Sequence, residues 1–304
     1  MDGRVSNLRQ LISVTRYTLS EGEGRGLDVL DCNNGRLRFL VNLSRAGDIM
    51  QMFHEGMNLS FVSKNGFNNR SCDFLRRFEG GMLYTCGLDS VGGREGYELH
   101  GTLHLMAAEL VRAEASEEGI CVELTVRDSA LFGKNLVLHR TVTTALGEDV
   151  LHITDTLENR GTRDEEYCLL YHVNVGYPML DEGAKIIADI TSCEPRTPYA
   201  KQNEETLDTV SAPIDNEEES CYFLDLECPR ISLVNERINK SLTLSYSKES
   251  LSEFVLWKSP AGGDYALGLE PATTKLDDLF AYRVIRKGEK ISFSLSLGVN
   301  TIRD

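Results

Sequence analysis

Three consecutive segments near the middle of the chain carry the pattern that most constrains its fold. Residues 120–127 alternate apolar and polar side chains over most of their length, residues 136–142 alternate less strictly, and residues 150–157 repeat the pattern. Successive side chains of a β-strand point to opposite faces of the sheet, so a period of two indicates strands with one buried face. We therefore predict an antiparallel meander with one solvent-exposed face.

Most of the remaining sequence also resembles short strands separated by turns. Segments 36–41, 49–53 and 59–62 are strand-like, and the last two flank a hairpin loop at residues 54–57. Helical periodicity is scarce: residues 106–115 suit a helix by composition although their neighbours favour a strand, and residues 7–14 and 275–282 suit short helical turns. No internal repeat or linker divides the chain. We expect a single all-β sandwich spanning residues 1–304.

Residues 191–220 differ in character from the strand-rich sequence around them. They are rich in Glu, Asp, Asn and Thr and contain Pro195, Pro198 and Pro213. We expect a surface excursion of the single domain here, which is either a lid beside a pocket or a solvated loop without a role.

Charge and cysteine content exclude several classes of partner. The net charge of −15 disfavours nucleic acid and anionic membranes as partners. No apolar run is long enough to span a membrane, and no apolar signal core follows Met1. The eight cysteines form no Cys-x-x-Cys pair and have no nearby histidine cluster, so we expect no thiolate metal site. Reduced cysteines favour a cytoplasmic location.

The segment 167–178 begins as an apolar strand and ends in polar residues at a turn. His172 and Asn174 are two residues apart, so on a strand they point to the same face, and Gly176 and Pro178 then end the strand. This arrangement suits the floor of a pocket. The alternative is a core histidine that is simply hydrogen-bonded to a neighbour.

Two arginines near turns are candidates for binding a substrate. Arg45 lies just before a strand, where it could reach into a pocket; the alternative is a local ion pair with Asp48. Arg76 precedes the pair Gly80-Gly81, where the backbone can turn sharply or approach another group closely. The planar guanidinium group of Arg76 could bind sugar hydroxyls or a carboxylate; the alternative is that Arg76 is a solvated loop arginine.

Three further residues have side chains of catalytic or sugar-binding type. His100 lies between a glycine-rich loop and a strand, where a structural histidine is the alternative. Glu270 ends an apolar strand, and burial there would raise its pKa as a general base requires, unless it reaches solvent. Trp257, the only tryptophan, could stack on a sugar ring or belong to the core. His172 and Glu270 could form an acid/base pair across a pocket.

These residues lie in motifs that resemble the aldose 1-epimerase (galactose mutarotase-like) superfamily, and more closely its DUF4432 branch. The resemblance spans most of the chain, from about Gly35 onward, and rests on the segments 74–76, 80–88, 99–101, 171–178 and 269–271, with residues 45–48 also similar. It implies a galactose mutarotase-like β-supersandwich with a sugar cleft on one face.

The resemblance also implies roles for individual residues. His172 matches the general acid and Glu270 the general base, while His100 matches a second histidine that helps to hold the sugar. Arg76 matches a substrate-binding arginine, with Arg77 as the alternative. The family's sugar-binding aspartate has no clear counterpart; Asp264 is one candidate.

The implied activity is the interconversion of the α and β anomers of an aldose. The general base would take the proton of the anomeric hydroxyl, and the general acid would protonate the ring oxygen. The ring would open, rotate and close on its other face, with no metal or organic cofactor required. Two alternatives stay open: a carbohydrate-binding protein without activity, and another sugar isomerase or lyase on the same fold. In each case the expected partner is a small sugar.

Overall fold

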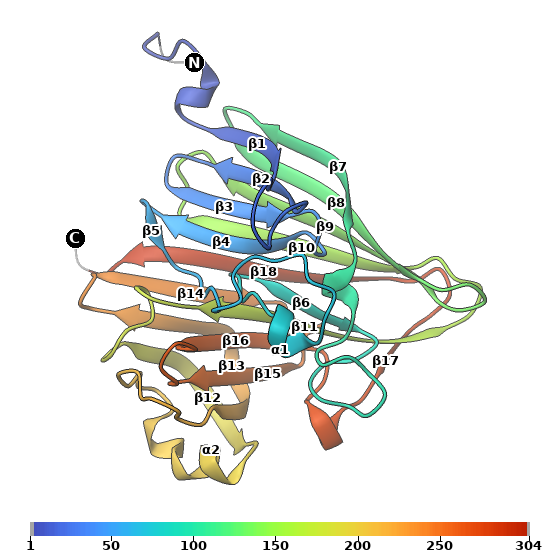
Figure 1. The fold of residues 1–304 in the computed structure, drawn as a ribbon, viewed down its shortest axis with the longest axis vertical. Coiled ribbons are helices and arrows are strands. Elements are labelled where there is room, and N and C mark those ends of the chain that lie inside the picture. Colours follow the sequence, from blue (N-terminus) through green and yellow to red (C-terminus); the bar gives the residue numbers. More distant parts are fainter. Residues whose placement is uncertain (1–2, 303–304) are drawn as a thin grey trace.

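Two antiparallel sheets of unequal size make up the fold, which a computed structural model describes for residues 3–302 (Figure 1). The small sheet is a five-stranded meander in the order β1-β2-β3-β4-β5. The large sheet has thirteen strands, eleven of them in the order β17-β11-β16-β15-β13-β14-β18-β10-β9-β8-β7; β12 pairs with β13 and β6 pairs with β11.

The strands of the small sheet are β1 (Ser13–Thr18), β2 (Asp28–Asn33), β3 (Leu37–Asn42), β4 (Asp48–His54) and β5 (Met57–Asn58). Those of the large sheet are β6 (Tyr84–Leu88), β7 (Ala108–Ala115), β8 (Gly119–Ser129), β9 (Asn135–Ala145), β10 (Val150–Asn159), β11 (Glu165–Val175), β12 (Lys185–Pro195), β13 (Ser220–Asn235), β14 (Lys240–Tyr246), β15 (Glu253–Ser259), β16 (Ala266–Ala272), β17 (Arg283–Ile285) and β18 (Lys290–Thr301). The helical segments are η1 (Leu8–Gln10), α1 (Phe74–Arg77), η2 (Leu103–Leu105), α2 (Pro198–Gln202), η3 (Glu204–Thr206) and η4 (Asp277–Leu279).

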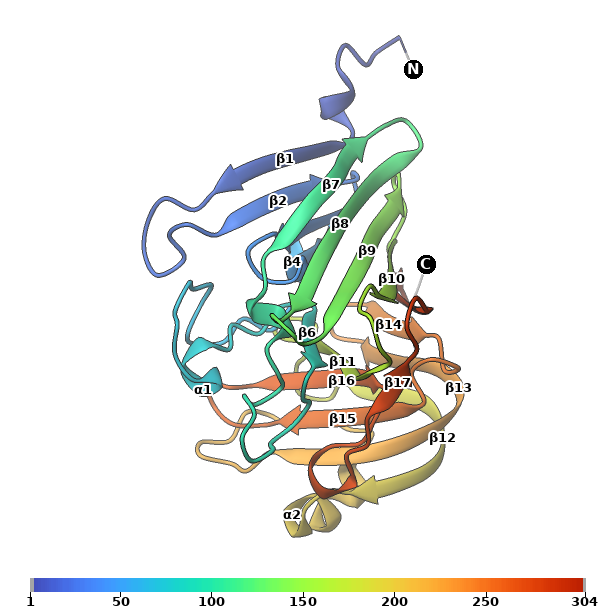
Figure 2. The same ribbon diagram turned by 90° about the vertical axis from the view of Figure 1, so that its right-hand side faces the viewer.

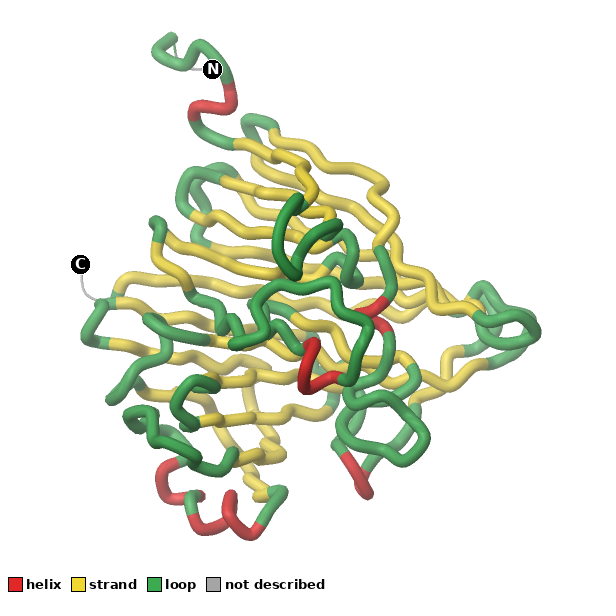
Figure 3. Tube along the Cα trace, in the orientation of Figure 1, coloured by secondary structure: helices red, strands yellow, loops and turns green. Residues whose placement is uncertain are grey.

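The alternating segments form the predicted meander. Strand β8 pairs antiparallel with β9, and β9 pairs with β10. In β8 the side chains of Val122, Leu124 and Val126 are buried while the intervening side chains are partly exposed. The prediction of an all-β fold is confirmed, residues 108–115 are a strand rather than a helix, and the helical segments are short (Figure 3).

The main core lies between the small sheet and the meander, which Figure 2 shows side by side. Phe39 and Ile49 from the small sheet belong to the same buried cluster as Leu124, Val142 and Ile153 from the meander. Each buried face is therefore covered by the other sheet, as a two-layer β-fold requires.

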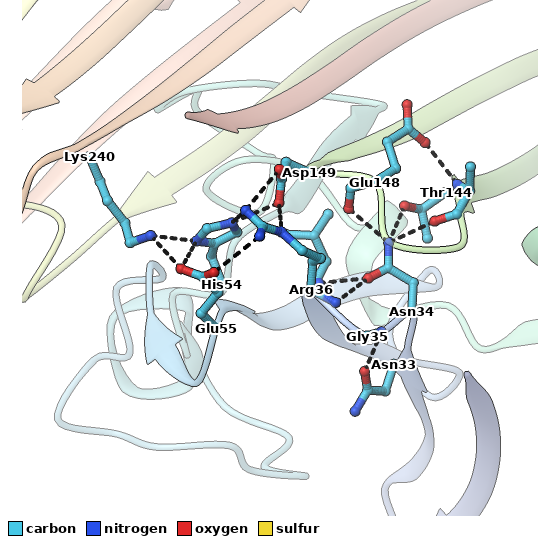
Figure 4. A network of polar contacts seen from close by, with 12 residues as sticks. Asn33, Asn34, Gly35, Arg36, His54, Glu55, Thr144, Glu148, Asp149 and Lys240 are labelled. Carbon is cyan, nitrogen blue, oxygen red and sulfur yellow. Dashed lines mark hydrogen bonds and ion pairs between the residues drawn. The ribbon is translucent and has the colours of Figure 1, made fainter. Parts of the chain in front are cut away.

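A polar network connects the two sheets at one corner (Figure 4). His54, at the end of β4, is 1% exposed; its Nε2 lies 2.8 Å from Asp149, and its Nδ1 lies 2.9 Å from the Lys240 ammonium of β14. Arg36 donates to the same aspartate at 2.6 Å. The buried imidazole thus has a partner on both nitrogens, which makes it a structural histidine.

The expected surface excursion needs one correction. Residues 191–195 belong to β12, so the first part of the predicted segment is a strand of the large sheet. Beyond Pro195 the chain leaves the sheet, forms α2 and η3, and returns at Ser220, where β13 begins. Across residues 3–302, the helices are too short or too polar to cross a membrane.

Candidate functional site

A cleft of about 630 Å³ opens on one face of the large sheet, in the size range of small-molecule sites. Its floor is made by β11, β13, β15 and β16, and its walls come from α1, from the loop that ends at His100, and from the segment between β12 and β13. The segment expected to be a lid or a solvated loop therefore contributes one wall of the cleft.

Strand pairing places His172 and Glu270 together on this floor. In the antiparallel pair of β11 and β16, Val173 is the partner of Leu269, which sets His172 opposite Glu270. Side chains directly opposite each other on one face of a sheet come into contact. His172 Nε2 lies 3.3 Å from Glu270 Oε1, so the predicted pair is in direct contact.

Both members of the pair are buried and incompletely hydrogen-bonded. His172 is 5% exposed and Glu270 is 2% exposed. Among residues 3–302, neither His172 Nδ1 nor Glu270 Oε1 has a hydrogen-bond partner, since the 3.3 Å contact lacks hydrogen-bond geometry. A buried polar atom without a partner is costly, and both residues line the cleft, which makes the pair a candidate for contact with a ligand.

Burial moves both groups toward their neutral forms. It lowers the pKa of His172 well below its usual value, and the nearby His100 lowers it further. Burial also raises the pKa of Glu270 well above its usual value; Glu219 adds to this effect and Arg196 opposes it. Both shifts favour a carboxylic acid beside a neutral imidazole, a form in which the pair carries one titratable proton.

A glycine makes room for this carboxyl group. A Cβ atom on Gly268, two residues before Glu270 on the same face of β16, would lie 2.3 Å from Glu270 Oε1 and 3.1 Å from the Trp257 side chain. Only a residue without a side chain leaves the Glu270 carboxyl group where it is. Gly268 was not predicted from the sequence, because the space that it leaves for the carboxyl group depends on how β15 and β16 are paired.

His100 and Trp257 flank the pair. The His100 ring centroid lies 5.5 Å from that of His172, and burial, followed by Arg196, lowers the pKa of His100 to about 4. Its φ of 63° lies in the left-handed region, a strained conformation for a histidine that is often found at functional sites. Trp257 is half-buried, and its ring centroid also lies 5.5 Å from that of His172.

Four of the predicted site residues therefore line the same cleft, namely His172, Glu270, His100 and Trp257. Asp264 lines it as well and forms an ion pair of 2.7 Å with Lys64. These residues lie up to 170 positions apart in the chain, as His100 and Glu270 illustrate, and the large sheet brings them together.

None of the predicted arginines is among the described residues that line the cleft. Arg76 points to solvent with 79% of its side chain exposed, beside Asp73. Arg77 points inward and binds Glu98 at 2.9 Å. Arg45 reaches backbone carbonyls of the loop at residues 68–70 at 3.4–3.5 Å.

Asp48 and Asn174 also have structural partners. The alternative of an ion pair between Arg45 and Asp48 is wrong, because Asp48 binds Arg140 at 3.0 Å and Thr85 at 2.5 Å. Asn174 is fully buried and donates from Nδ2 to the backbone carbonyls of Gly81 at 3.0 Å and His172 at 2.9 Å. It ties β11 to the turn at Gly80-Gly81 beneath the cleft.

Four charged residues that line the cleft were not predicted from the sequence: Lys64, Arg196, Glu217 and Glu219. Three of them lie in the segment between β12 and β13, where the composition indicated an excursion but no individual residue stood out. In the described part of the chain, no group of three or more His, Cys, Asp or Glu side chains is arranged to hold a metal ion.

Comparison with solved structures identifies the fold. A proposed aldose 1-epimerase from Klebsiella pneumoniae subsp. pneumoniae MGH 78578 superposes with a TM-score of 0.85 at 22% identity, over 95% of this chain and 83% of that one. A galactose mutarotase-like protein from Clostridium acetobutylicum superposes with a TM-score of 0.73 at 12% identity, over 96% and 99% of the two chains. At these identities the likeness shows a galactose mutarotase-like β-sandwich and leaves the activity open.

A second galactose mutarotase-like protein, from Lactobacillus casei ATCC 334, has a TM-score of 0.62 at 12% identity, over 90% of this chain and all of that one. Among curated proteins, no sequence matches the chain. The sequence profile described as "Domain of unknown function (DUF4432)" matches residues 24–291, which is most of the chain. The resemblance seen in the motifs is thereby confirmed, and the chain belongs to the DUF4432 family.

Proposed function

We propose that this chain is an aldose 1-epimerase-like enzyme that interconverts the α and β anomers of an aldose, with residues 1–304 forming one sugar-binding domain. The observation that carries the proposal is the buried pair of His172 and Glu270, whose side chains lie 3.3 Å apart on the floor of a cleft, each with an atom that has no hydrogen-bond partner among the described residues. Anomer exchange needs one proton donor and one acceptor near the same carbon, and this pair supplies both.

The proton balance of the pair matches that reaction. Burial favours a pair that holds one proton, located on Glu270 before a sugar binds. A sugar hydroxyl that donates to the Glu270 carboxylate would favour its ionised form, with the proton moving to His172. Glu270 then takes the proton of the anomeric hydroxyl while His172 protonates the ring oxygen. After rotation of the aldehyde, the ring closes with both transfers reversed, and the pair returns to its starting state.

The walls of the cleft suit a sugar ring. Trp257 offers a partly exposed aromatic face of the kind on which sugars stack, and His100 lies close enough to His172 to help hold the ring. Polar groups along the walls provide hydrogen-bond partners for hydroxyls.

The test is anomer exchange by NMR over a panel of free aldoses, with the wild-type protein beside His172→Asn and Glu270→Gln. We expect accelerated exchange for at least one aldose, reduced at least 100-fold in either variant, because each proton transfer contributes typically about 10²–10⁴-fold. Sugar binding without acceleration would instead indicate a carbohydrate-binding protein. Conversion to a product other than the second anomer would indicate another sugar isomerase or lyase.

A further inference from the structure

The two cations that line the cleft are already neutralised by carboxylates. Lys64 forms an ion pair with Asp264 at 2.7 Å, and Arg196 forms one with Asp277 of η4. A phosphate or carboxylate group on a ligand binds tightly where a free guanidinium or ammonium can meet it. Neither cation lining this cleft is free for that purpose.

Two carboxylates of the cleft wall, by contrast, have no cationic partner among the described residues. Glu217 accepts a hydrogen bond from the Tyr199 hydroxyl at 2.5 Å, and Glu219 accepts one from Trp257 Nε1 at 2.7 Å. Both donors are neutral, so the two negative charges remain uncompensated. With their partners included, two cations face four carboxylates, which leaves an excess of two negative charges around the cleft even when Glu270 is protonated.

The acidic wall belongs to a site rather than to an ordinary solvated surface. It forms part of the wall of the cavity that His172 and Glu270 also line, and both of those side chains are more than nine-tenths buried and keep an atom without a hydrogen-bond partner among the described residues. Glu219 lies close enough to Glu270 to raise the pKa of its carboxyl group. A ligand that contacts the pair therefore occupies a cleft that these carboxylates also line.

We propose that Glu217 and Glu219 make the cleft selective by charge: it takes uncharged and amino-substituted aldoses and excludes phosphorylated and carboxylated ones. The inference rests on the proposed function for the site, and it names the class of sugar. A cation on the sugar gains from the uncompensated carboxylates, whereas an anion is repelled by them and meets only paired cations.

The experiment compares three hexoses that differ at one carbon: glucose, 6-amino-6-deoxyglucose and glucose 6-phosphate, together with the same series of galactose. Dissociation constants are measured by NMR titration at pH 6.5, where the amino group carries its proton, and anomer exchange is recorded on the same samples. We expect the amino sugar to bind at least as tightly as the neutral sugar, and the phosphate roughly ten-fold or more weakly. The difference should shrink in 1 M salt, because partly exposed charges are screened.

The variants Glu217→Gln and Glu219→Gln separate charge from shape, since glutamine keeps a hydrogen-bond acceptor for Tyr199 or Trp257. Each should weaken binding of the amino sugar and strengthen binding of the phosphate by roughly five-fold, both relative to the neutral sugar measured with the same variant. Glu218→Gln is the matched control: Glu218 is exposed, lies between the two and does not line the cleft. It should change none of the three constants.

The outcomes separate the two proposals. The expected order of binding without anomer exchange supports charge selection and counts against the epimerase. Charge selection is overturned if the phosphorylated sugar binds as tightly as the neutral sugar, or if its dissociation constant is the same in both variants as in the wild type. If anomer exchange is still observed in that case, the epimerase proposal stands. Failure of all three sugars of both series to bind also overturns it.

Discussion

Two consecutive residues of β11, Tyr171 and His172, lie on opposite faces of the large sheet and in opposite kinds of polar environment. Tyr171 faces the core, where its hydroxyl donates to Asp155 at 2.8 Å. Arg140, 1% exposed, binds the same aspartate at 2.7 Å and Asp48 at 3.0 Å. Among the described residues, every buried side-chain nitrogen and oxygen of this cluster has a partner.

On the other face, His172 and Glu270 line the cleft and are almost as deeply buried, yet each keeps an atom without a hydrogen-bond partner among the described residues. Burial of polar groups therefore does not distinguish structure from function in this protein. These two clusters differ in their hydrogen bonding: the Arg140 cluster is satisfied and holds the sheets together, whereas the pair that lines the cleft keeps unpartnered atoms.

The largest effect on stability should come from breaking the satisfied cluster. Arg140→Met would leave Asp48 and Asp155 buried without their cation, which should lower the free energy of unfolding by about 3–5 kcal/mol. Urea denaturation measures this change. Arg163→Met is the control, since Arg163 is 64% exposed and its ion pair with Glu165 should contribute less than about 1 kcal/mol. Equal losses in both variants would contradict a structural role for the Arg140 cluster.

The unsatisfied pair should show the reverse behaviour. Glu270→Gln should reduce anomer exchange at least 100-fold while changing the free energy of unfolding by less than about 1 kcal/mol, because Glu270 Oε1 has no hydrogen bond to lose. Denaturation and NMR exchange are measured on the same preparation. A loss of stability like that of Arg140→Met would mean that Glu270 is part of the framework.

The dependence of exchange on pH sharpens the comparison further. The active pair carries one proton, so activity should be lost at low pH when His172 gains a second proton and at high pH when Glu270 ionises. The pKa of His172 is lowered and that of Glu270 is raised, so the low-pH limit of activity should lie well below pH 6.5 and the high-pH limit well above pH 4.5. Removing the negative charge in Glu219→Gln should lower the pKa of Glu270 and move the high-pH limit to lower pH. A high-pH limit that stays in place would show that Glu270 does not set it.

The smallest effect is expected for Tyr171→Phe. Asp155 would lose one hydrogen bond and keep both contacts with Arg140, so the free energy of unfolding should fall by about 1–2 kcal/mol. Anomer exchange should be unchanged, because the ring of residue 171 faces away from the cleft. A clear change in exchange rate with unchanged stability would show that the two faces of β11 are coupled.

Several features of the site were predictable because they are local. The alternation of apolar and polar residues in β8, β9 and β10 is a property of each strand by itself, and it predicted the meander correctly. Likewise, His172 and Glu270 each lie within a largely apolar strand that is buried in the structure, where a polar side chain is costly unless it is used. The motifs around them pointed to the right fold and family.

The arginines were predicted less well because their directions depend on packing. Asp73 caps the short helix α1 by accepting the backbone N–H of Arg76, and in this helix Arg76 faces solvent while Arg77 faces inward. Asp48 likewise finds Arg140, 92 residues away, rather than its near neighbour Arg45. Residues that are close in sequence are the obvious candidates for an ion pair. A buried carboxylate, however, needs a cation that is also buried, and that cation can come from a distant part of the chain.

The sequence by itself determined the all-β class, many of the strands, the family and the two residues that form the candidate acid/base pair, because these follow from local periodicity and from motifs. Only the tertiary structure decided that Val173 pairs with Leu269, which sets His172 opposite Glu270, and that Gly268 leaves space for the carboxyl group. It also brought Glu217 and Glu219 to the cleft from a segment whose composition indicated only a surface excursion. Strand register and loop placement depend on contacts between distant parts of the chain, which no local pattern records.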